Sequence, residues 1–187
     1  MQNRTTLLDD RAHVVYCKRL IDWLFADQTF PAVLQAEDFD AGSNGQSYYD
    51  GTPGDYGGTN YRNPPTDMDI EGCVGGACGY WLSWVHPGEW VKYSFNVTAT
   101  ASYTFEARVT TQDIGSYVGS GGTFHMEIDG VDKTGPMTLP DTGGAWTTLS
   151  KPNITLSAGS HTMRVVSDTG SPVTGWVGKF DHFKLTP

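Results

Sequence analysis

A cluster of aromatic residues between Gly79 and Tyr93 is the part of the sequence best suited to binding a ligand. The run contains three tryptophans and two tyrosines, and Pro87-Gly88 places a tight turn within it. A buried indole needs a partner for its N–H, so a small core seldom uses this many tryptophans. Beside a turn, an indole presents a flat apolar face that suits the C–H face of a sugar ring. The alternative is that these tryptophans cap the core.

Acidic residues in the same region offer a second kind of chemistry. Glycoside hydrolysis needs two carboxylates that face each other across the sugar, and the candidates are Asp67, Asp69, Glu71 and Glu89. The first three alternate along the chain, as residues on the solvated face of a strand do. No nucleophile elbow, zinc-binding helix motif or phosphate loop accompanies them. The residues favour a binding protein, and a small glycoside hydrolase or lyase that uses Glu71 or Glu89 is the enzymatic alternative.

Oxygen-bearing side chains from the two ends of the sequence that follows Pro31 are candidates for a calcium site. Gln35 and Glu37 lie in the first predicted strand of this part, and Asp181 lies in the last. Calcium prefers hard oxygen ligands, which these three residues supply. An ion held by them would fasten the first strand to the last, so we expect its role to be structural.

Cysteine spacing indicates the redox environment. Cys73 and Cys78 enclose Val-Gly-Gly-Ala, a loop flexible enough for the two sulfurs to meet. A zinc site would need further ligands, and no histidine lies near. We therefore expect a local disulfide and an oxidising, extracellular location. The first ten residues lack the pattern of a signal peptide, so export would be directed by sequence not present here, as part of a larger polypeptide.

The charge balance excludes several classes of partner. With 12 Lys and Arg against 21 Asp and Glu, the net charge is −9. Nucleic acids and anionic membrane surfaces need basic patches, so neither is expected as a partner. No apolar run approaches 18 residues. A neutral polysaccharide is compatible with this charge, and we expect a monomer.

The elements that position these residues are short strands. Residues 1–31 show apolar positions at helical spacing. We expect them to form an N-terminal extension or linker with helical structure that ends at Pro31. From residue 32 to 187 the period changes to two, and turn signals separate the runs. This pattern predicts an all-β fold, a two-sheet antiparallel β-sandwich. The apolar positions that alternate are Val91, Tyr93, Phe95 and Val97; Tyr103, Phe105, Ala107 and Val109; Phe124, Met126 and Ile128; and Met163 and Val165.

The last predicted strand also alternates. Asp181, Phe183 and Leu185 are expected on one face, with Phe180, His182 and Lys184 on the other. By contrast, residues 40–80 are rich in glycine and loop signals, which is typical of a functional loop.

Six motifs occur in the order in which family 6 carbohydrate-binding modules carry them, and residues 34–187 resemble that family. One motif is weak on its own, but the ordered set is specific. The motifs are Gln35-Ala36-Glu37-Asp38-Phe39-Asp40; Asn60-Tyr61-Arg62-Asn63 with Asp67-Met68-Asp69-Ile70-Glu71; Leu82-Ser83-Trp84 with Gly88-Glu89-Trp90-Val91-Lys92-Tyr93; Leu139-Pro140-Asp141-Thr142-Gly143-Gly144-Ala145-Trp146; Leu156-Ser157-Ala158-Gly159-Ser160-His161-Thr162-Met163-Arg164; and Phe180-Asp181-His182-Phe183.

The resemblance implies a non-catalytic jelly-roll β-sandwich that is attached to a polysaccharide-degrading enzyme. In the family, two aromatic side chains in loops at one edge of the sandwich clasp a sugar ring, and Trp84 and Trp146 match these positions. Asn60 and Tyr61 match a loop that adds further contacts. The family's structural calcium ion matches Gln35, Glu37 and Asp181, where Gln35 replaces the more usual glutamate.

Two departures from the family pattern affect the expected site. Ala145 is inserted before Trp146 and is expected to shift that indole relative to Trp84. Lys179 stands where many relatives have a sugar-binding asparagine. Lysine can donate a hydrogen bond to a sugar hydroxyl but cannot accept one, so either the ligand preference has changed or Trp176 and its neighbours take over that contact. The motifs look most like those of modules attached to laminarinases and agarases, so we favour β-1,3-glucan or an agar-type galactan as the ligand. A structural or adhesive β-sandwich is the non-binding alternative.

Overall fold

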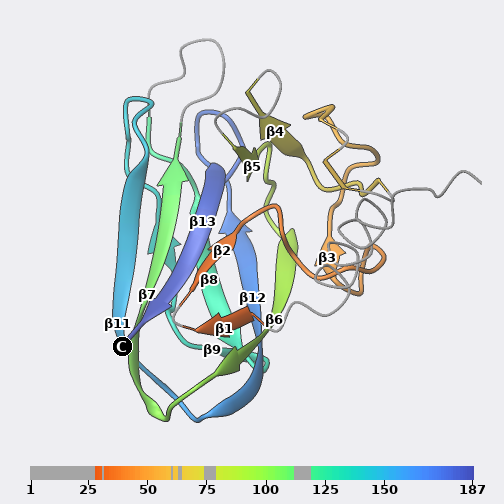
Figure 1. Ribbon diagram of the computed structural model, residues 1–187. Helices are drawn as coiled ribbons and strands as arrows, with labels where there is room; N and C mark the ends of the chain where they lie inside the picture. Colours follow the sequence, from red (N-terminus) through yellow and green to blue (C-terminus); the bar gives the residue numbers. More distant parts are fainter. Residues whose placement is uncertain (1–27, 31, 60, 63–64, 74–78, 112–118) are drawn as a thin grey trace, which may run out of the picture.

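The computed structural model describes most of the chain from residue 28 onward. The described residues are 28–30, 32–59, 61–62, 65–73, 79–111 and 119–187. The helix predicted within residues 1–31 lies outside these ranges, apart from residues 28–30. The described ranges contain strands and no helix (Figure 1). Among them, no helix has the length and apolar character needed to cross a bilayer.

Thirteen strands in the described residues form two packed sheets, which confirms the predicted β-sandwich. The seven-stranded sheet has the order β1-β6-β12-β8-β10, with β3 paired to β6 and β9 to β8. Its strands are β1 (Gln28–Phe30), β3 (Tyr48–Tyr49), β6 (Trp90–Val97), β8 (Thr123–Ile128), β9 (Val131–Asp132), β10 (Met137–Thr138) and β12 (Gly159–Thr169).

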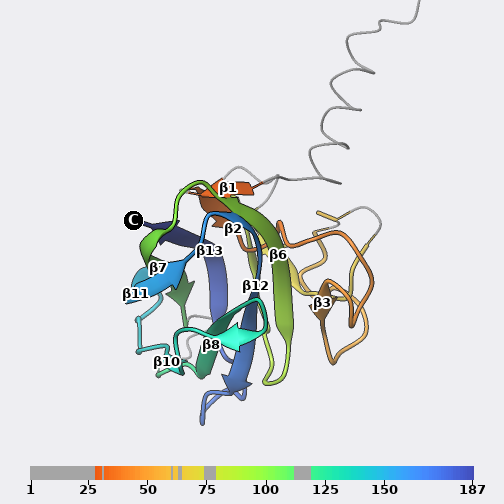
Figure 2. The same cartoon turned by 90° about the horizontal axis from the view of Figure 1, so that it is seen from below.

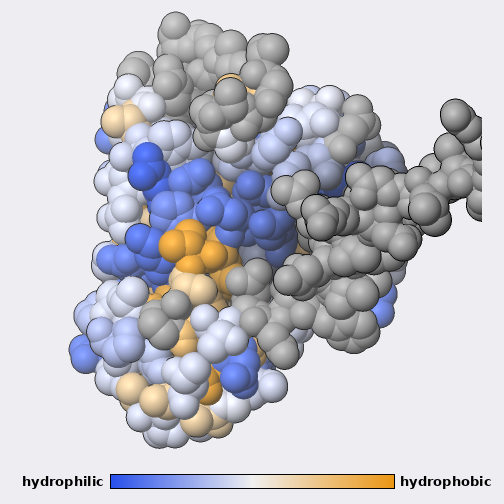
Figure 3. Space-filling model, viewed as in Figure 1, coloured by the Kyte–Doolittle hydropathy of each residue, from blue (hydrophilic) through white to orange (hydrophobic). Residues whose placement is uncertain are grey.

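The six-stranded sheet has the order β11-β7-β13-β5-β4, with β2 paired to β13. Its strands are β2 (Val33–Gln35), β4 (Ile70–Gly72), β5 (Tyr80–Leu82), β7 (Ala101–Thr110), β11 (Thr147–Leu156) and β13 (Lys179–Thr186). The side of the molecule shown in Figure 3 is largely hydrophilic, and its most hydrophobic atoms are seen near the centre and below it.

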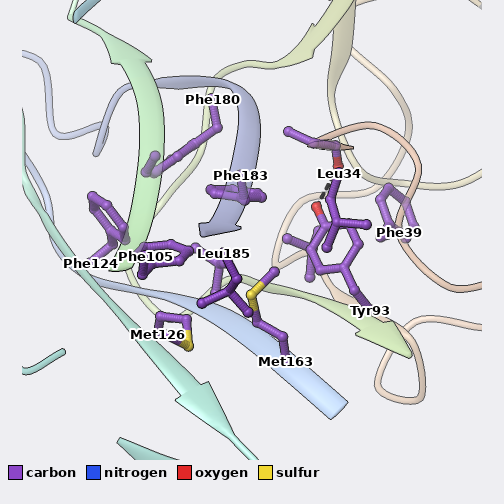
Figure 4. Packing of buried hydrophobic residues seen from close by; sticks show 14 of the residues in the cluster. Leu34, Phe39, Tyr93, Phe105, Phe124, Met126, Met163, Phe180, Phe183 and Leu185 are labelled. Atoms are coloured by element: carbon purple, nitrogen blue, oxygen red, sulfur yellow. Dashed lines mark hydrogen bonds between the residues drawn. The ribbon is translucent and has the colours of Figure 1, made fainter. Parts of the chain in front are cut away.

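The core lies between the sheets and is built from the residues that alternate in the sequence. In β6 the buried positions are Val91, Tyr93, Phe95 and Val97, as the period of two predicts. Aromatic rings from both sheets meet in this layer, as Figure 4 shows for Tyr93 and Phe183, whose ring centres lie 5.8 Å apart. The Tyr93 hydroxyl, itself buried, donates to the carbonyl of Ala36 at 2.7 Å. This bond satisfies the phenol and ties the first strands to the core.

The sandwich includes residues that precede the predicted domain boundary at residue 32. Strand β1 runs parallel to β6, with Phe30 opposite Val97. The Phe30 side chain is fully buried and meets the Phe95 ring edge-on, with 4.9 Å between ring centres. The end of the N-terminal extension therefore contributes to the core.

Strand β13 departs from the predicted alternation at Asp181. Phe180 and Phe183 both point into the core, with 5.9 Å between their ring centres, so the prediction that they face opposite ways was wrong. Phe180 lies opposite Val109 and His182 lies opposite Arg108, so Asp181 is an extra residue in the strand. Such a β-bulge reverses the side-chain alternation after it, and it leaves Asp181 on the partly exposed side.

The long loop that contains β3 lies beside the sandwich, next to β6 (Figures 1 and 2). Tyr48 and Tyr49 pair with Val91 and Trp90. Backbone bonds continue this contact, from the Lys92 amide to the Ser47 carbonyl at 3.0 Å and from the Asp40 amide to the Lys92 carbonyl at 2.8 Å. Residues 40–49 of this loop therefore form an ordered edge of the seven-stranded sheet.

Candidate functional site

Four half-buried tryptophans gather around the first residue of β13. None of the tryptophans in the described residues is part of the buried core. Trp81 lies in β5, Trp84 follows it, Trp146 precedes β11, and Trp176 lies in the turn before β13. Large aromatic side chains that remain accessible at one end of a sandwich are suited to ligand contact. The alternative that they only fill the core is not what the structure shows.

A buried ion pair lies at the centre of this aromatic end. Lys179 Nζ is 2.6 Å from Glu71 Oε2, and the two side chains are 11% and 10% exposed. The same Glu71 oxygen accepts hydrogen bonds from Trp81 Nε1 and from Ser83 Oγ, both at 2.9 Å. The Lys179 ammonium also lies 5.8 Å from the centre of the Trp84 ring. Glu71 and Lys179 therefore connect Trp81 to Trp84.

The ionisation state of Glu71 argues against the enzymatic alternative. Burial by itself raises the pKa of Glu71, but the hydrogen bonds from Lys179, Trp81 and Ser83 and the Lys179 charge outweigh it, so the pKa is lowered. A general acid for glycoside hydrolysis needs a raised pKa and a free proton. Glu71 is ionised at neutral pH and is engaged by three donors.

The other acidic candidates are also used within the protein. Glu89 is 2% exposed, and its two oxygens accept the backbone amides of Gly51 and His86. Asp69 is also 2% exposed and accepts the Tyr56 amide at 2.6 Å. The expectation that Asp67, Asp69 and Glu71 share a solvated strand face was wrong, because β4 begins only at Ile70 and the preceding residues turn inward.

The backbone conformation of Trp84 helps to place its indole at the rim. Its φ angle is 46°, in the left-handed region that bulky residues rarely adopt. Such a conformation costs about 1–3 kcal/mol and persists where surrounding bonds enforce it. The Ser83 amide donates to the Asp69 carbonyl at 2.9 Å, and the Val85 carbonyl accepts the Val177 amide at 2.7 Å. These bonds hold both neighbours of Trp84 in place.

Three of the predicted sugar-binding residues line one pocket. Trp84, Trp176 and Lys179 line a shallow depression with an enclosed volume of only about 20 Å³, so a sugar ring would lie over its mouth. Ser83, Thr111, Thr174 and Gly178 complete the lining. The His86 ring lies edge-on to Trp176, with 6.5 Å between ring centres. The pocket thus offers indole faces beside small hydroxyl groups, a combination suited to a sugar ring.

Trp146 packs beside Trp81, which sequence reasoning did not assign to the site. The two rings meet edge-on with 5.9 Å between centres, and the Arg108 guanidinium is 5.9 Å from the Trp146 ring. The loop that carries Trp146 is held by Thr142, whose hydroxyl lies 3.0 Å from the Thr110 hydroxyl. Trp81 lies opposite Glu71 in the β4–β5 pair, and this register was not apparent from the sequence.

Lys179 and Tyr61 are more enclosed than their predicted roles require. Lys179 is 9% exposed, and its ammonium group is already engaged in the ion pair with Glu71. Tyr61 donates its hydroxyl to Asp38 Oδ1 at 2.6 Å and packs against Tyr80, with 4.4 Å between ring centres. Burial is the main cause that raises the pKa of Tyr61. Asn60 lies outside the described residues.

Arg62, next to Tyr61, acts as a clamp on the first loop. It is 6% exposed and donates to the carbonyls of Glu37, Phe39 and Asp40 at 2.9, 2.7 and 3.2 Å. Its guanidinium also lies 4.0 Å from the centre of the Phe39 ring. The Tyr-Arg pair therefore fixes the segment that carries the predicted calcium ligands.

The predicted calcium ligands lie close together in β2, the residues that follow it, and β13. Gln35 pairs with His182, and the Ala36 amide donates to the Asp181 carbonyl at 2.9 Å. Glu37 is 4% exposed, and its Oε2 is buried with no hydrogen-bond donor among the described residues. The pKa of Glu37 is raised to about 8, mainly by burial and in smaller part by the charges of Asp38 and Asp181.

These features fit a bound cation, which would compensate the buried charge of Glu37. In the part of the chain that is described, no group of three or more His, Cys, Asp and Glu residues is arranged as a metal site. A site here would therefore use Gln35 as its third side chain. Asp181 also contacts basic groups, since its Oδ2 is 3.2 Å from Arg108 Nε and 2.9 Å from His182 Nδ1.

Cys73, one of the two cysteines predicted to pair, is disulfide-bonded. Cys78, its predicted partner, lies outside the described residues.

Comparison with known families finds one match, and it covers most of the sandwich. Residues 60–187 match the model of the family described as "Carbohydrate binding module (family 6)". No curated protein matches the chain.

Solved structures share the fold. The C-terminal module of a marine laminarinase from Zobellia galactanivorans is 21% identical, with 83% of this chain and 98% of that chain covered and a TM-score of 0.56. A β-1,3-glucan-binding module from Bacillus halodurans is 22% identical, with coverage of 86% and 98% and a TM-score of 0.57. A module from Clostridium cellulolyticum, solved with xylose, is 22% identical, with coverage of 86% and 100% and a TM-score of 0.57. At these identities the similarity shows the fold.

Proposed function

Because the chain belongs to family 6 of the carbohydrate-binding modules, which are non-catalytic, we propose that its aromatic pocket binds a β-linked neutral polysaccharide. The observation that carries this proposal is the pocket lined by Trp84, Trp176 and Lys179. Indole faces stack on the C–H face of a pyranose, and the partly exposed hydroxyl groups of Thr111 and Thr174 bond to its hydroxyls. A single site of this kind would bind with a Kd of about 10⁻⁶ to 10⁻³ M.

The electrostatics of the pocket support a neutral ligand. Among the described residues that line the pocket, Lys179 alone is charged, and Glu71 neutralises it at 2.6 Å. With a net charge of −9, the rest of the protein repels polyanions such as sulfated glycans. Among neutral glycans we favour a β-1,3-glucan or an agar-type galactan, on the motifs that resemble laminarinase and agarase modules.

We also propose that the module works in an exported polypeptide and brings an attached glycoside hydrolase to its substrate. The disulfide bond of Cys73 supports an oxidising location. Weak binding at one site is sufficient for such a role, because a tether keeps the enzyme near any chain that the module holds.

Affinity electrophoresis in gels that contain laminarin, agarose, lichenan, xylan or alginate tests the proposal. We expect retardation by laminarin or agarose, little by xylan, and none by the anionic alginate. The same polysaccharides incubated with the protein should yield no new reducing ends. Retardation by alginate alone would contradict the proposed ligand class, and turnover that Glu71→Gln or Glu89→Gln abolishes would make the protein an enzyme.

A calcium ion at Gln35, Glu37 and Asp181 is the second part of the proposal. The side-chain carbonyl of Gln35 and the two carboxylates would hold the ion, which would supply the positive charge that the buried Glu37 oxygen lacks. In this position the ion fastens β2 to β13, so its effect is on stability.

Calcium is therefore expected to raise the melting temperature of the protein. At a concentration 100 times its Kd, a ligand that binds only the folded state stabilises by about 2.7 kcal/mol, or about 5–10 °C for a domain of this size. Differential scanning fluorimetry with calcium and with EDTA measures the shift. Glu37→Gln should abolish it, whereas Asp132→Asn, at an exposed turn, should keep it. An equal calcium shift in wild type and Glu37→Gln would place the ion elsewhere.

A further inference from the structure

A second pair of buried carboxyl groups lies behind the turn that carries Trp84. Asp50 and Glu89 are 4% and 2% exposed, and they are neighbours, because the amide of Gly51, next to Asp50, donates to Glu89 Oε1 at 3.2 Å. Asp50 Oδ1 accepts the amide and the hydroxyl of Thr52 at 2.7 and 2.8 Å. Asp50 Oδ2 is buried and has no donor among the described residues. Two carboxylates cannot bond to each other unless one of them carries a proton.

Glu89 joins two segments that are distant in the sequence. Its Oε2 accepts the His86 amide at 2.8 Å, within the turn that follows Trp84. Its Oε1 accepts the Gly51 amide at 3.2 Å, in the loop after β3. Both Glu89 oxygens therefore already accept N–H groups, whereas Asp50 Oδ2 accepts none. One proton held between the two carboxyl groups would supply the donor that the pair lacks.

We propose that Asp50 and Glu89 share one proton at neutral pH and act as positioning residues that hold the loop after β3 against the Trp84 turn. Loss of the proton places two buried negative charges side by side, and their repulsion destabilises the packing of the two segments. The turn also carries His86, whose ring contacts Trp176. The effect on sugar affinity rests on the proposed function, but the shared proton does not.

The surroundings of Asp50 and Glu89 favour the form of the pair that carries a proton. Burial raises the pKa of Glu89 to about 7, and it also raises the pKa of Asp50. The charged groups that face the pair are acidic: the charge of Asp67 helps to raise the pKa of Asp50, and the charge of Asp50 helps to raise the pKa of Asp69. His86 contributes its backbone amide. A cation could also satisfy two carboxylates, but no third His, Cys, Asp or Glu in the described residues joins them in a metal site.

Asp50→Asn tests the proton directly. The asparagine keeps an oxygen for Thr52 and places an N–H where the shared proton lies. Urea unfolding between pH 5 and 8 should show a wild-type unfolding constant that rises with pH, because the raised pKa loses its stabilising proton as the pH increases. The unfolding constant of the variant should rise less steeply with pH, because the variant has about one proton fewer to lose. The difference in slope is up to about tenfold per pH unit. Asp132→Asn, at an exposed turn, is the control and should keep the wild-type slope.

Glu89→Gln is the matched opposite variant. Its amide group must face either the Gly51 or the His86 N–H, so it should destabilise the protein more than Asp50→Asn does. If Asp50→Asn fails to fold, amide hydrogen exchange of wild type provides the test. Exchange at Gly51 and His86 should accelerate above pH 7 by more than the tenfold per pH unit of base catalysis, and Gly143, bonded to Asp141, should not.

Three results would overturn the shared proton. The first is an unfolding constant with the same pH slope in wild type and Asp50→Asn, and the second is a slope difference that disappears with calcium and returns with EDTA. The third is amide hydrogen exchange at Gly51 and His86 that rises with pH only as base catalysis predicts. If the protein binds no glycan, these measurements still test the proton. Where it does bind, the affinity of wild type should fall about tenfold between pH 6 and 8 while that of Asp50→Asn stays constant.

Discussion

Lys179→Met is expected to lower the free energy of unfolding by about 3–5 kcal/mol, as the loss of one partner from a buried ion pair does. Lys179 and Glu71 are 9% and 8% exposed, so the variant leaves a buried carboxylate without its counter-charge. Methionine keeps most of the side-chain volume, which separates the charge from the packing. The corresponding fall in melting temperature is about 10 °C. Urea denaturation at pH 7 measures the free energy.

A double-mutant cycle separates the pair from its surroundings. Glu71→Gln keeps an acceptor for Trp81 and Ser83, and the double variant Glu71→Gln with Lys179→Met removes both charges. The double variant should be more stable than Lys179→Met alone, because no unpaired charge remains. Lys184→Met, on the same strand at a partly exposed position, is the control. A Lys179→Met variant within about 1 kcal/mol of wild type would show that the pair contributes little.

The pH dependence of this effect has a defined sign. The pKa of Glu71 is lowered by its donors from its ordinary value of 4.5, so its contribution is complete above that pH. It is lost as the pH falls through the lower pKa of the folded protein. The stability difference between wild type and Lys179→Met should therefore decrease in acid.

Trp84→Ala is expected to weaken polysaccharide binding by about 2 kcal/mol or more, or about thirtyfold in Kd. The indole is half-buried and lines the pocket, so its loss removes the stacking surface and not a part of the core. Trp176→Ala should have a similar effect. The melting temperature should stay within about 4 °C of wild type in both variants. Isothermal titration calorimetry with laminari-oligosaccharides measures the affinity.

Two further tryptophans localise the site. Trp146 lies beside Trp81, and Trp146→Ala reports whether a bound chain extends from the pocket onto this second pair of rings. Trp90, on β6 with the Arg164 guanidinium 4.5 Å from its ring centre, belongs to the other sheet. Trp90→Ala should leave binding unchanged. Loss of binding in Trp90→Ala with wild-type affinity in Trp84→Ala would move the site to the seven-stranded sheet.

Much of the fold follows from local patterns in the sequence. Strands β6, β7 and β8 bury the residues that the period of two predicted, because alternate side chains of any strand point to opposite faces. The turn His86-Pro87-Gly88-Glu89 is also local, since Gly88 adopts a φ of 90° that its type permits. The family resemblance likewise depends on motifs that are contiguous in the chain.

The composition of the site was decided by pairings between distant residues. Glu71 and Lys179 are separated by 108 positions and meet because β4, β5 and β13 are neighbours in one sheet. Glutamate and lysine are usually exposed, so the sequence alone predicted that Glu71 lies on a solvated face and that Lys179 contacts a sugar. The extra residue at Asp181, which reverses the side-chain alternation of β13, is likewise apparent only from the pairing of β13 with β7.

Local sequence patterns therefore predicted most of the strands, most of the core residues and the family that the chain resembles. Those properties depend on the alternation and turn chemistry of neighbouring residues. Only the tertiary structure decided that Glu71 neutralises Lys179, that Trp146 packs on Trp81, and that Asp50 meets Glu89. Strand order and register create these contacts, and burial then changes the charge state of the groups that meet.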